Sequence, residues 1–291
     1  VSACGHGVFF GVASVAVSSL VPVERRGAAL SLFVGGITVA NILGLPAGTA
    51  IGNVFGWRVA FVCIAALALL SVVAVLFTLP AQAKGEEAAD APLRVQARQL
   101  RNHDVWLSYL TIAIIMVGQL AFGTFQVAIL TTVTGIPDGL VPYYLLAGGA
   151  GAVVGIWLGG KGADWNIAAS IMIIVVGQVL SFLLLLPAVH HPVTMAIMLF
   201  VSSLFGFGFS TPVQLRILQG ARAAPRLAST MVSTAYNIGI AAGAALGALL
   251  LNAGLDYALL PATGVLTSTL AGIIALISIR LPYSSNIPAT V

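Results

Sequence analysis

The chain is a succession of long apolar runs separated by short polar connections. The runs are continuous and do not alternate between apolar and polar residues, so they predict helices rather than the strands of a barrel. Each is long enough to cross a bilayer, which takes about 20 helical residues. The pattern predicts nine membrane-spanning helices, near residues 1–20, 27–54, 57–80, 105–131, 140–160, 167–188, 193–214, 228–252 and 258–280.

The composition requires a lipid environment for these helices. Hydrophobic residues make up 59% of the 291 and charged residues 7%, against roughly 25% charged residues in a soluble domain. The mean hydropathy is +1.08. A soluble fold of this length lacks the charges to cover its surface, whereas lipid tails require none. We therefore predict an all-α, polytopic membrane protein.

The positions of the basic residues predict the orientation. If successive helices alternate in direction, all basic residues except Arg58 fall on one side of the membrane. Basic residues gather on the cytoplasmic side of membrane proteins, so this side is expected to be cytoplasmic and to hold the C-terminus. The residues on that side are Arg25, Arg26, Lys84, Arg94, Arg98, Arg101, Lys161, Arg216, Arg222, Arg226 and Arg280.

The sequence contains no pattern that indicates an enzyme or a metal centre. Cys4 and Cys63 both lie inside predicted spans, where cysteine is usually a small packing residue. CxxC, HExxH, P-loop and dinucleotide-binding motifs are all absent. We expect no cofactor, no metal and no nucleic-acid partner, and the adjacent His190 and His191 are expected to be ordinary loop residues.

Three spans carry glycines four residues apart, and such residues share one helix face. The first row lies in the sequence NILGLPAGTAIG (41–52), with Pro46 inside it. A glycine row lets another backbone approach closely, either within a bundle or at a surface that moves. The three rows are Gly44, Gly48 and Gly52; Gly151, Gly155 and Gly159; and Gly239, Gly243 and Gly247.

Two stretches resemble a known family. Residues 5–61, from GHGVFFG to GWRVAF, are similar to the fourth and fifth helices of a major facilitator superfamily transporter, and the glycine-proline block resembles the antiporter motif of the fifth helix. Residues 210–251 resemble the tenth and eleventh helices. Within the superfamily the chain looks like the twelve-helix drug:proton antiporter branch, which includes arabinose-efflux and chloramphenicol-resistance permeases.

The resemblance implies a fold of two six-helix bundles. Nine spans that end at the family's C-terminus imply a major facilitator fold without its first three helices. Residues 1–80 are then the remnant of the N-terminal bundle, 81–103 a cytoplasmic linker, and 104–291 the C-terminal bundle with a short tail. Such a transporter is expected in the plasma (inner) membrane, as a monomer when full length.

The family binds substrate at mid-membrane between its bundles. On the span 105–131, aromatic and amide side chains follow one another at helical spacing, which suits a bulky amphipathic compound; hydrogen bonds between glutamines on neighbouring helices are the alternative. The expected substrate-binding residues are Gln119, Phe122, Phe125, Gln126, Tyr236, Asn237 and Asn41.

The resemblance also assigns a seam and a gate. In the family fold the three glycine rows, with Pro46, would lie on helices at the seam between the bundles. Arg25, Arg26 and Asp164 would belong to the cytoplasmic gate, although Trp165 stands where the gate motif usually has a basic residue. A solvated carboxylate near Lys161 is the alternative for Asp164.

The coupling chemistry is less visible. No acidic or basic side chain lies in the central part of a predicted span. The proton-binding carboxylate of an antiporter is therefore expected on the helices that the chain lacks. His6 is a candidate proton relay because histidine titrates near neutral pH; a hydrogen bond to a neighbouring helix is the alternative.

The leading hypothesis is a secondary transporter that exports a small amphipathic compound, such as chloramphenicol, in exchange for protons by alternating access. A second hypothesis is an exporter of an arabinose-like sugar. A third is of another class: a truncated, non-transporting product or a membrane assembly partner. For the transporters the partners are the small-molecule substrate, protons and the lipid bilayer.

Overall fold

The structure is a computed structural model that describes residues 36, 40, 43, 44, 46–78, 103–221 and 225–280. Within these residues it contains helices and turns and no strand. Seven of its described helical segments are long and apolar enough to cross a membrane. The prediction of an all-α membrane protein is confirmed.

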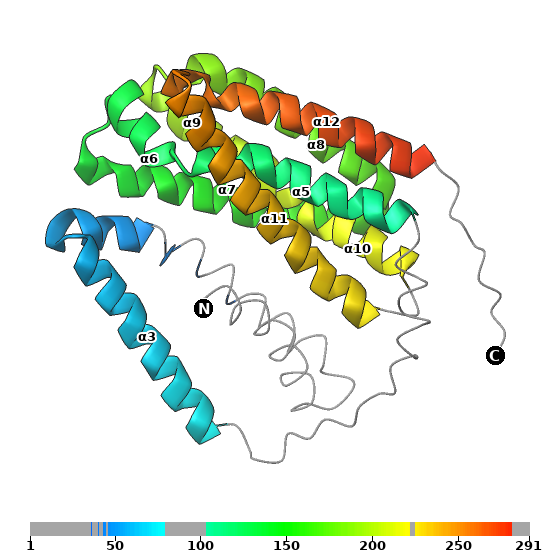
Figure 1. Cartoon of the computed structure of the whole chain (residues 1–291), viewed down its shortest axis with the longest axis horizontal. Helices are drawn as coiled ribbons and strands as arrows, with labels where there is room; N and C mark the ends of the chain where they lie inside the picture. The colour runs from blue at the N-terminus through cyan, green and yellow to red at the C-terminus, as the bar shows by residue number, and fades with distance from the viewer. Residues whose placement is uncertain are drawn as a thin grey trace. The chain divides into compact units, whose positions relative to one another are not determined.

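Figure 1 shows the elements in order. A helix over 46–55 precedes them. The elements are α3 (Trp57–Thr78), α5 (His103–Gly123), α6 (Gln126–Ala128), the π-helix η2 (Ile129–Val133), the 3-10 helix η3 (Asp138–Leu140), α7 (Val141–Trp165), α8 (Ile167–Ala188), α9 (Pro192–Gly208), α10 (Ser210–Gly220), α11 (Pro225–Asn252), the 3-10 helix η4 (Tyr257–Leu259) and α12 (Leu260–Arg280).

The predicted runs from residue 57 onward agree closely with these helices. The run 167–188 coincides with α8. Where the run 105–131 was predicted, helical structure extends from His103 to Val133 and is interrupted. A turn at residues 124–125 separates α5 from α6 and η2. The run 193–214 extends to Gly220 and is interrupted at Phe209, between α9 and α10. The run 1–20 and most of 27–54 lie outside the described residues, so the total of nine stays a prediction.

The turn between α7 and α8 is a single residue. The side chain of Asn166 accepts a hydrogen bond of 2.9 Å from the Ala169 backbone N–H. Asparagine is a favourable N-cap because its side chain satisfies one of the backbone donors at a helix start. The preceding connection between residues 46–55 and α3 is equally tight and needs Gly56, whose φ of 87° few other residues adopt.

The chain divides into two compact units, residues 1–89 with 137–149 and residues 90–136 with 150–291. In the first unit, the Asn53 side-chain amide donates to the backbone oxygen of Asp138 at 2.9 Å. Most of α3 is exposed, and its large apolar side chains, such as Leu70 and Phe77, point away from any protein core. A helix that is apolar and exposed all round is suited to lipid.

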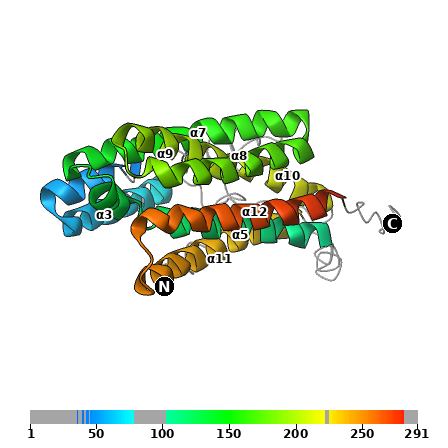
Figure 2. The same ribbon diagram turned by 90° about the horizontal axis from the view of Figure 1, so that it is seen from above.

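In the second unit, α5 is the central helix. It packs against α10, α11 and α12, while α8 packs against α9, α10 and α12. Figure 2 shows these helices running along a common direction. About half of α5 is buried, including the small polar residues Ser108 and Thr111. Their hydroxyls donate to backbone oxygens one turn earlier in the same helix, so burial leaves neither donor unsatisfied.

Two of the glycine rows pack within this second unit. A Cβ on Gly151, Gly155 or Gly159 would overlap the backbone oxygen of a residue on α9, and these contacts advance in parallel along the two helices. The row on α11, Gly239 with Gly243 and Gly247, meets the backbone of α5 in the same way. These faces are filled by neighbouring helices of the same unit, which favours close packing within one bundle, the alternative. A place for these rows at the seam between bundles stays a prediction.

The row in the first unit has different surroundings. No described atom lies within 4 Å of the place that a Cβ would take on Gly44, Gly48 or Gly52. Pro46, between them, is buried. For this row and Pro46, a place at the seam stays a prediction.

We predict that Gly155→Ala destabilises the protein more than Gly160→Ala. The new methyl group at 155 overlaps the backbone oxygen of Leu204, which cannot move without displacing α9. Overpacking of this kind costs about 1–3 kcal/mol. At Gly160 no described atom lies within 4 Å, so alanine there leaves stability unchanged or slightly raised. The free energy of unfolding in mixed micelles checks this, and equal stability of the two variants contradicts it.

Candidate functional site

The predicted substrate residues of α5 turn in several directions. Gln119 accepts a hydrogen bond of 3.2 Å from the Gln178 side-chain amide of α8. Gln178 is 1% exposed, so this contact lies in the interior of the bundle. Gln119 therefore makes an interhelical glutamine hydrogen bond, as the alternative proposed, although its partner is a residue that the sequence did not single out.

The two phenylalanines also make aromatic contacts with different elements. Phe122 is buried and meets Phe182 of α8 edge to face, with 6.1 Å between ring centroids. Phe125 lies beside Tyr257 of η4, at 6.3 Å. Gln126 is half-buried at the start of α6. Gln119 and Phe122 therefore contact α8, whereas Phe125 contacts η4.

Tyr236 and Asn237 lie near the opposite end of the α5–α11 contact. Tyr236 packs against Phe209, at 6.1 Å between ring centroids. Gly247 is next to Phe125, whereas Gly239 is next to Ala113. Helices rise 1.5 Å per residue, so Tyr236 and Phe125 are separated by roughly 20 Å along the bundle. A single small molecule does not reach both.

Asn237 belongs to a polar stripe on α11. Thr230, Thr234 and Asn237 follow one another at spacings of four and three residues, and all three are exposed. The Asn237 side-chain amide donates to the Ser233 backbone oxygen at 2.8 Å. This group, called the α11 polar stripe below, gives the middle and the first half of a membrane helix an exposed polar face.

The remaining sequence candidates are only partly described. Asp164 is exposed near the end of α7, and Lys161 extends along the same helix with its Nζ 3.8 Å from the centre of the Trp157 ring. His6, Arg25, Arg26 and Asn41 lie outside the described residues. Among the described residues, no group of three or more His, Cys, Asp or Glu is arranged to hold a metal.

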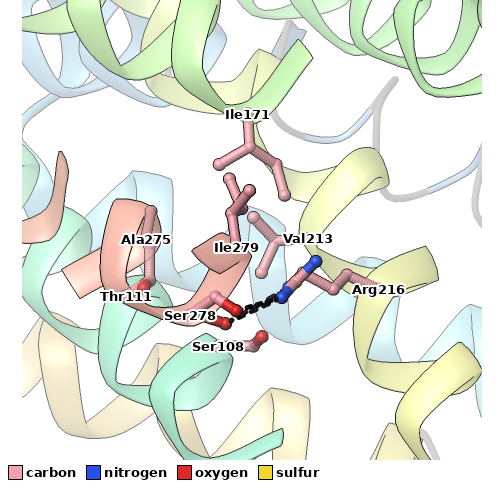
Figure 3. Close-up of a pocket in the computed structure, with 8 residues that line it drawn as sticks. All are labelled: Ser108, Thr111, Ile171, Val213, Arg216, Ala275, Ser278 and Ile279. Atoms are coloured by element: carbon pink, nitrogen blue, oxygen red, sulfur yellow. Dashed lines mark hydrogen bonds between the residues drawn. The ribbon is translucent and has the colours of Figure 1, made fainter. Parts of the chain in front are cut away.

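The sequence did not single out a buried arginine in α10. Arg216 is 9% exposed and points across to the last turns of α12, as Figure 3 shows. Its Nη2 donates to the Ser278 backbone oxygen at 2.6 Å, and both Nε and Nη2 lie 3.2 Å from the Ser278 hydroxyl. The planar guanidinium suits such a double contact. Arg216 therefore fastens α10 to α12.

Asp104, at the start of α5, supplies the opposite charge. Its side chain is 4% exposed, and its carboxylate interacts electrostatically with Arg216 and with His103. A buried charge is costly in a membrane unless an opposite charge or hydrogen bonds compensate it. Arg216 and Asp104 carry opposite charges on neighbouring helices, and together with Ser278 they connect α5, α10 and α12.

A small cavity adjoins Arg216. It measures about 10 Å³, room for about one water molecule, and lies among α5, α8, α10 and α12 (Figure 3). Ser108, Thr111 and Ser278 supply its polar atoms. It is too small for a substrate. The Arg216 cluster, defined as Asp104, Arg216 and Ser278, is therefore a structural link at one end of the bundle.

Both interrupted spans carry aromatic contacts at their breaks. After α5, the Phe125 backbone N–H bonds to Phe122 in a tighter turn, and the π-helix η2 follows. Between α9 and α10, Phe209 is 1% exposed and touches Tyr236. Discontinuous membrane helices form the substrate and ion sites of many transporters. The two breaks are therefore candidate functional positions in this unit.

We predict that Arg216→Met destabilises the protein by about 3 kcal/mol or more, because it leaves a buried carboxylate and a buried carbonyl without the guanidinium. The stability of Arg216→Lys should fall between that of the parent protein and that of Arg216→Met, since one ammonium group cannot reproduce the double contact of the guanidinium. The control is Arg280→Met, an exposed arginine of α12, for which we expect a change within about 0.5 kcal/mol. Denaturation in mixed micelles measures all three, and similar losses at 216 and 280 contradict the prediction.

The chain is similar in sequence to several known proteins. The chain is 31% identical over 283 residues to the inner membrane transport protein YdhP of Escherichia coli (strain K12), covering 94% of this chain and 70% of YdhP. It is 29% identical over 244 residues to a chloramphenicol resistance protein of Streptomyces lividans, covering 84% of this chain and 62% of that protein. It is 30% identical over 261 residues to the putative transporter AraJ of Escherichia coli (strain K12), covering 88% and 65%.

The chain thus spans between 62% and 70% of the length of these relatives. The fold is also similar to the crystal structure of a bacterial homologue of the human lysosomal transporter Spinster, in an inward-facing and unoccupied conformation. The TM-score is 0.60 at 16% identity, with 91% of this chain and 72% of that chain covered. The family model of the Major Facilitator Superfamily matches residues 1–248. The chain belongs to the Major Facilitator Superfamily of membrane transport proteins.

Proposed function

We propose that the protein is a secondary active transporter that exports a small amphipathic compound from the cytoplasm in exchange for protons. It works by alternating access, as a monomer in the inner membrane with its C-terminus in the cytoplasm. Two of the relatives are named as transport proteins and a third as a chloramphenicol resistance protein. These names support transport in general and a drug of the chloramphenicol type as the first substrate to test.

The observation that carries the proposal is the α11 polar stripe. Thr230, Thr234 and Asn237 are exposed on a helix that is otherwise apolar enough to span a membrane. Polar side chains inside a membrane rarely face lipid and usually face a water-filled cavity or another helix. We assign the stripe to the aqueous path along which the substrate crosses.

The substrate site lies along this path. Of the residues first considered, Asn237 is exposed on the stripe, and Tyr236 lies beside it against the Phe209 break. Asn41 remains a candidate contact from the N-terminal bundle. Gln119 and Phe122 support the site from inside the bundle through Gln178 and Phe182. Phe125 and Gln126 lie too far along the helix to join the same contact, and they belong to the far end of the path.

The proposal predicts that Thr234→Cys reacts with a hydrophilic maleimide in membrane vesicles, in a background whose native Cys4 and Cys63 are replaced by serine. The thiol forms the reactive thiolate only where water reaches it. The control is Ile277→Cys, an exposed apolar position of α12, where we expect little labelling. Equal labelling at the two positions would overturn the assignment of the stripe to an aqueous path, whatever the substrate is.

The protein, expressed in cells that lack major efflux pumps, should lower the steady-state accumulation of chloramphenicol severalfold. An uncoupler should abolish this difference, because the proton gradient supplies the free energy for export. Equal accumulation with and without the uncoupler contradicts proton coupling. A parallel measurement with arabinose tests the sugar alternative, and lowered accumulation of arabinose alone would replace the drug by a sugar as substrate.

A further inference from the structure

A second, larger hollow opens on the outside of the bundle between α7, α8 and α9. It measures about 190 Å³. Gly155, Gly159 and Gly162 form its side along α7. Ile173 of α8 and Phe205 of α9 line it as well. We call it the α7–α8–α9 groove.

The groove is apolar and borders the exposed surface. Among the described residues that line it, only Ser170 and the indole N–H of Trp165 supply polar side-chain groups. Trp165 and Ile173, which also line it, are 73% and 58% exposed. An empty apolar hollow of this kind loses the dispersion contacts that its walls would otherwise make. In a bilayer, an acyl chain supplies those contacts without any change in the protein.

A positive charge stands at the edge of the groove. Lys161 follows Leu158 by three residues and precedes Trp165 by four, and both of these line the groove. Residues at these spacings are neighbours on a helix. Lys161 is exposed, and its Nζ lies 3.8 Å from the centre of the Trp157 ring. The carboxylate of Asp164 is also exposed, one turn further along.

Lys161, Trp157 and Trp165 indicate the level of the lipid headgroups. Tryptophan is enriched at the membrane interface, and lysines on the cytoplasmic side attract anionic lipids. α7 ends at Trp165 and α8 begins two residues later, so the mouth of the groove lies beside a helix turn, where headgroups are found. An apolar hollow with a cation at this level matches the two parts of a phospholipid.

We infer that the α7–α8–α9 groove binds an anionic phospholipid, with one acyl chain in the groove and its phosphate at Lys161. The inference is independent of the transported substrate. One lysine near an anionic surface contributes about 1 kcal/mol, so anionic lipid should be preferred about fivefold over zwitterionic lipid. Asp164 opposes this attraction, and Asp164→Asn should increase the preference.

The test uses Trp165 as a reporter inside the groove, with Trp57, Trp106 and Trp157 replaced by phenylalanine. The full chain is reconstituted in phosphatidylcholine vesicles in which one part in five of the lipid has brominated acyl chains. The brominated lipid is phosphatidylglycerol in one sample and phosphatidylcholine in the other. Bromine quenches tryptophan fluorescence on contact. We expect stronger quenching of Trp165 by brominated phosphatidylglycerol. Lys161→Gln should equalise the two lipids without abolishing quenching.

Matched variants separate the groove from general lipid contact. Ile173→Phe adds volume inside the groove and should weaken quenching by both lipids, whereas Ile277→Phe, on the exposed side of α12, should not. Mass spectrometry of lipid co-purified with the wild-type chain and with Lys161→Gln gives a second measurement that needs no tryptophan replacement. Equal quenching by the two lipids in the parent protein overturns the inference. So does an absence of quenching by both, which would mean that protein covers the groove.

Discussion

Helices inside a bilayer are not drawn together by the hydrophobic effect, because lipid is as apolar as their side chains. This chain relies on backbone contact instead. A glycine row on α7 meets carbonyl oxygens of α9, and a row on α11 meets those of α5, each time between parallel helices. The remaining helices pack around these two pairs, with Phe182 of α8 resting on Gly264 of α12.

The polar residues of this unit fall into two groups. Buried ones bond to other helices and stabilise the bundle, whereas exposed ones on α11 are candidates for a role in transport. Gln178 and Arg216 are buried, and each bonds to another helix, so they hold the bundle in register. Thr234 and Asn237 are exposed, and within the described part of the chain their side chains donate to backbone oxygens of their own helix. A hydrogen bond within the same helix satisfies the donor but fixes no neighbour. Such residues are available to water and substrate, and this is why the candidate site follows α11 rather than the buried glutamines.

The sequence was sufficient to predict where the helices lie along the chain, but it did not predict which helices pack against one another. Hydropathy located α8 to the residue because span length is a local property. Glycine spacing correctly indicated faces for close approach on α7 and α11. Spacing shows which residues share a face and never which helix meets it, so it did not identify α9 and α5 as the partners. Arg216 was classed as a loop cation because the apolar run was ended two residues before it. The threonines of the α11 polar stripe gave no signal, since exposure depends on neighbours that hydropathy does not identify.

The interruption at Phe209 divides one membrane span into two halves, α9 and α10, which are held by different helices. Up to Gly208, α9 is clamped along its length to α7, and α7 continues through one residue into α8. Beyond the break, α10 is tied through Arg216 to α12. Phe209 lies between the two halves and contacts Tyr236 of α11. Because α8 packs against both α9 and α10, the two halves of the span are joined through α8 as well as through Phe209, beside the polar face of α11.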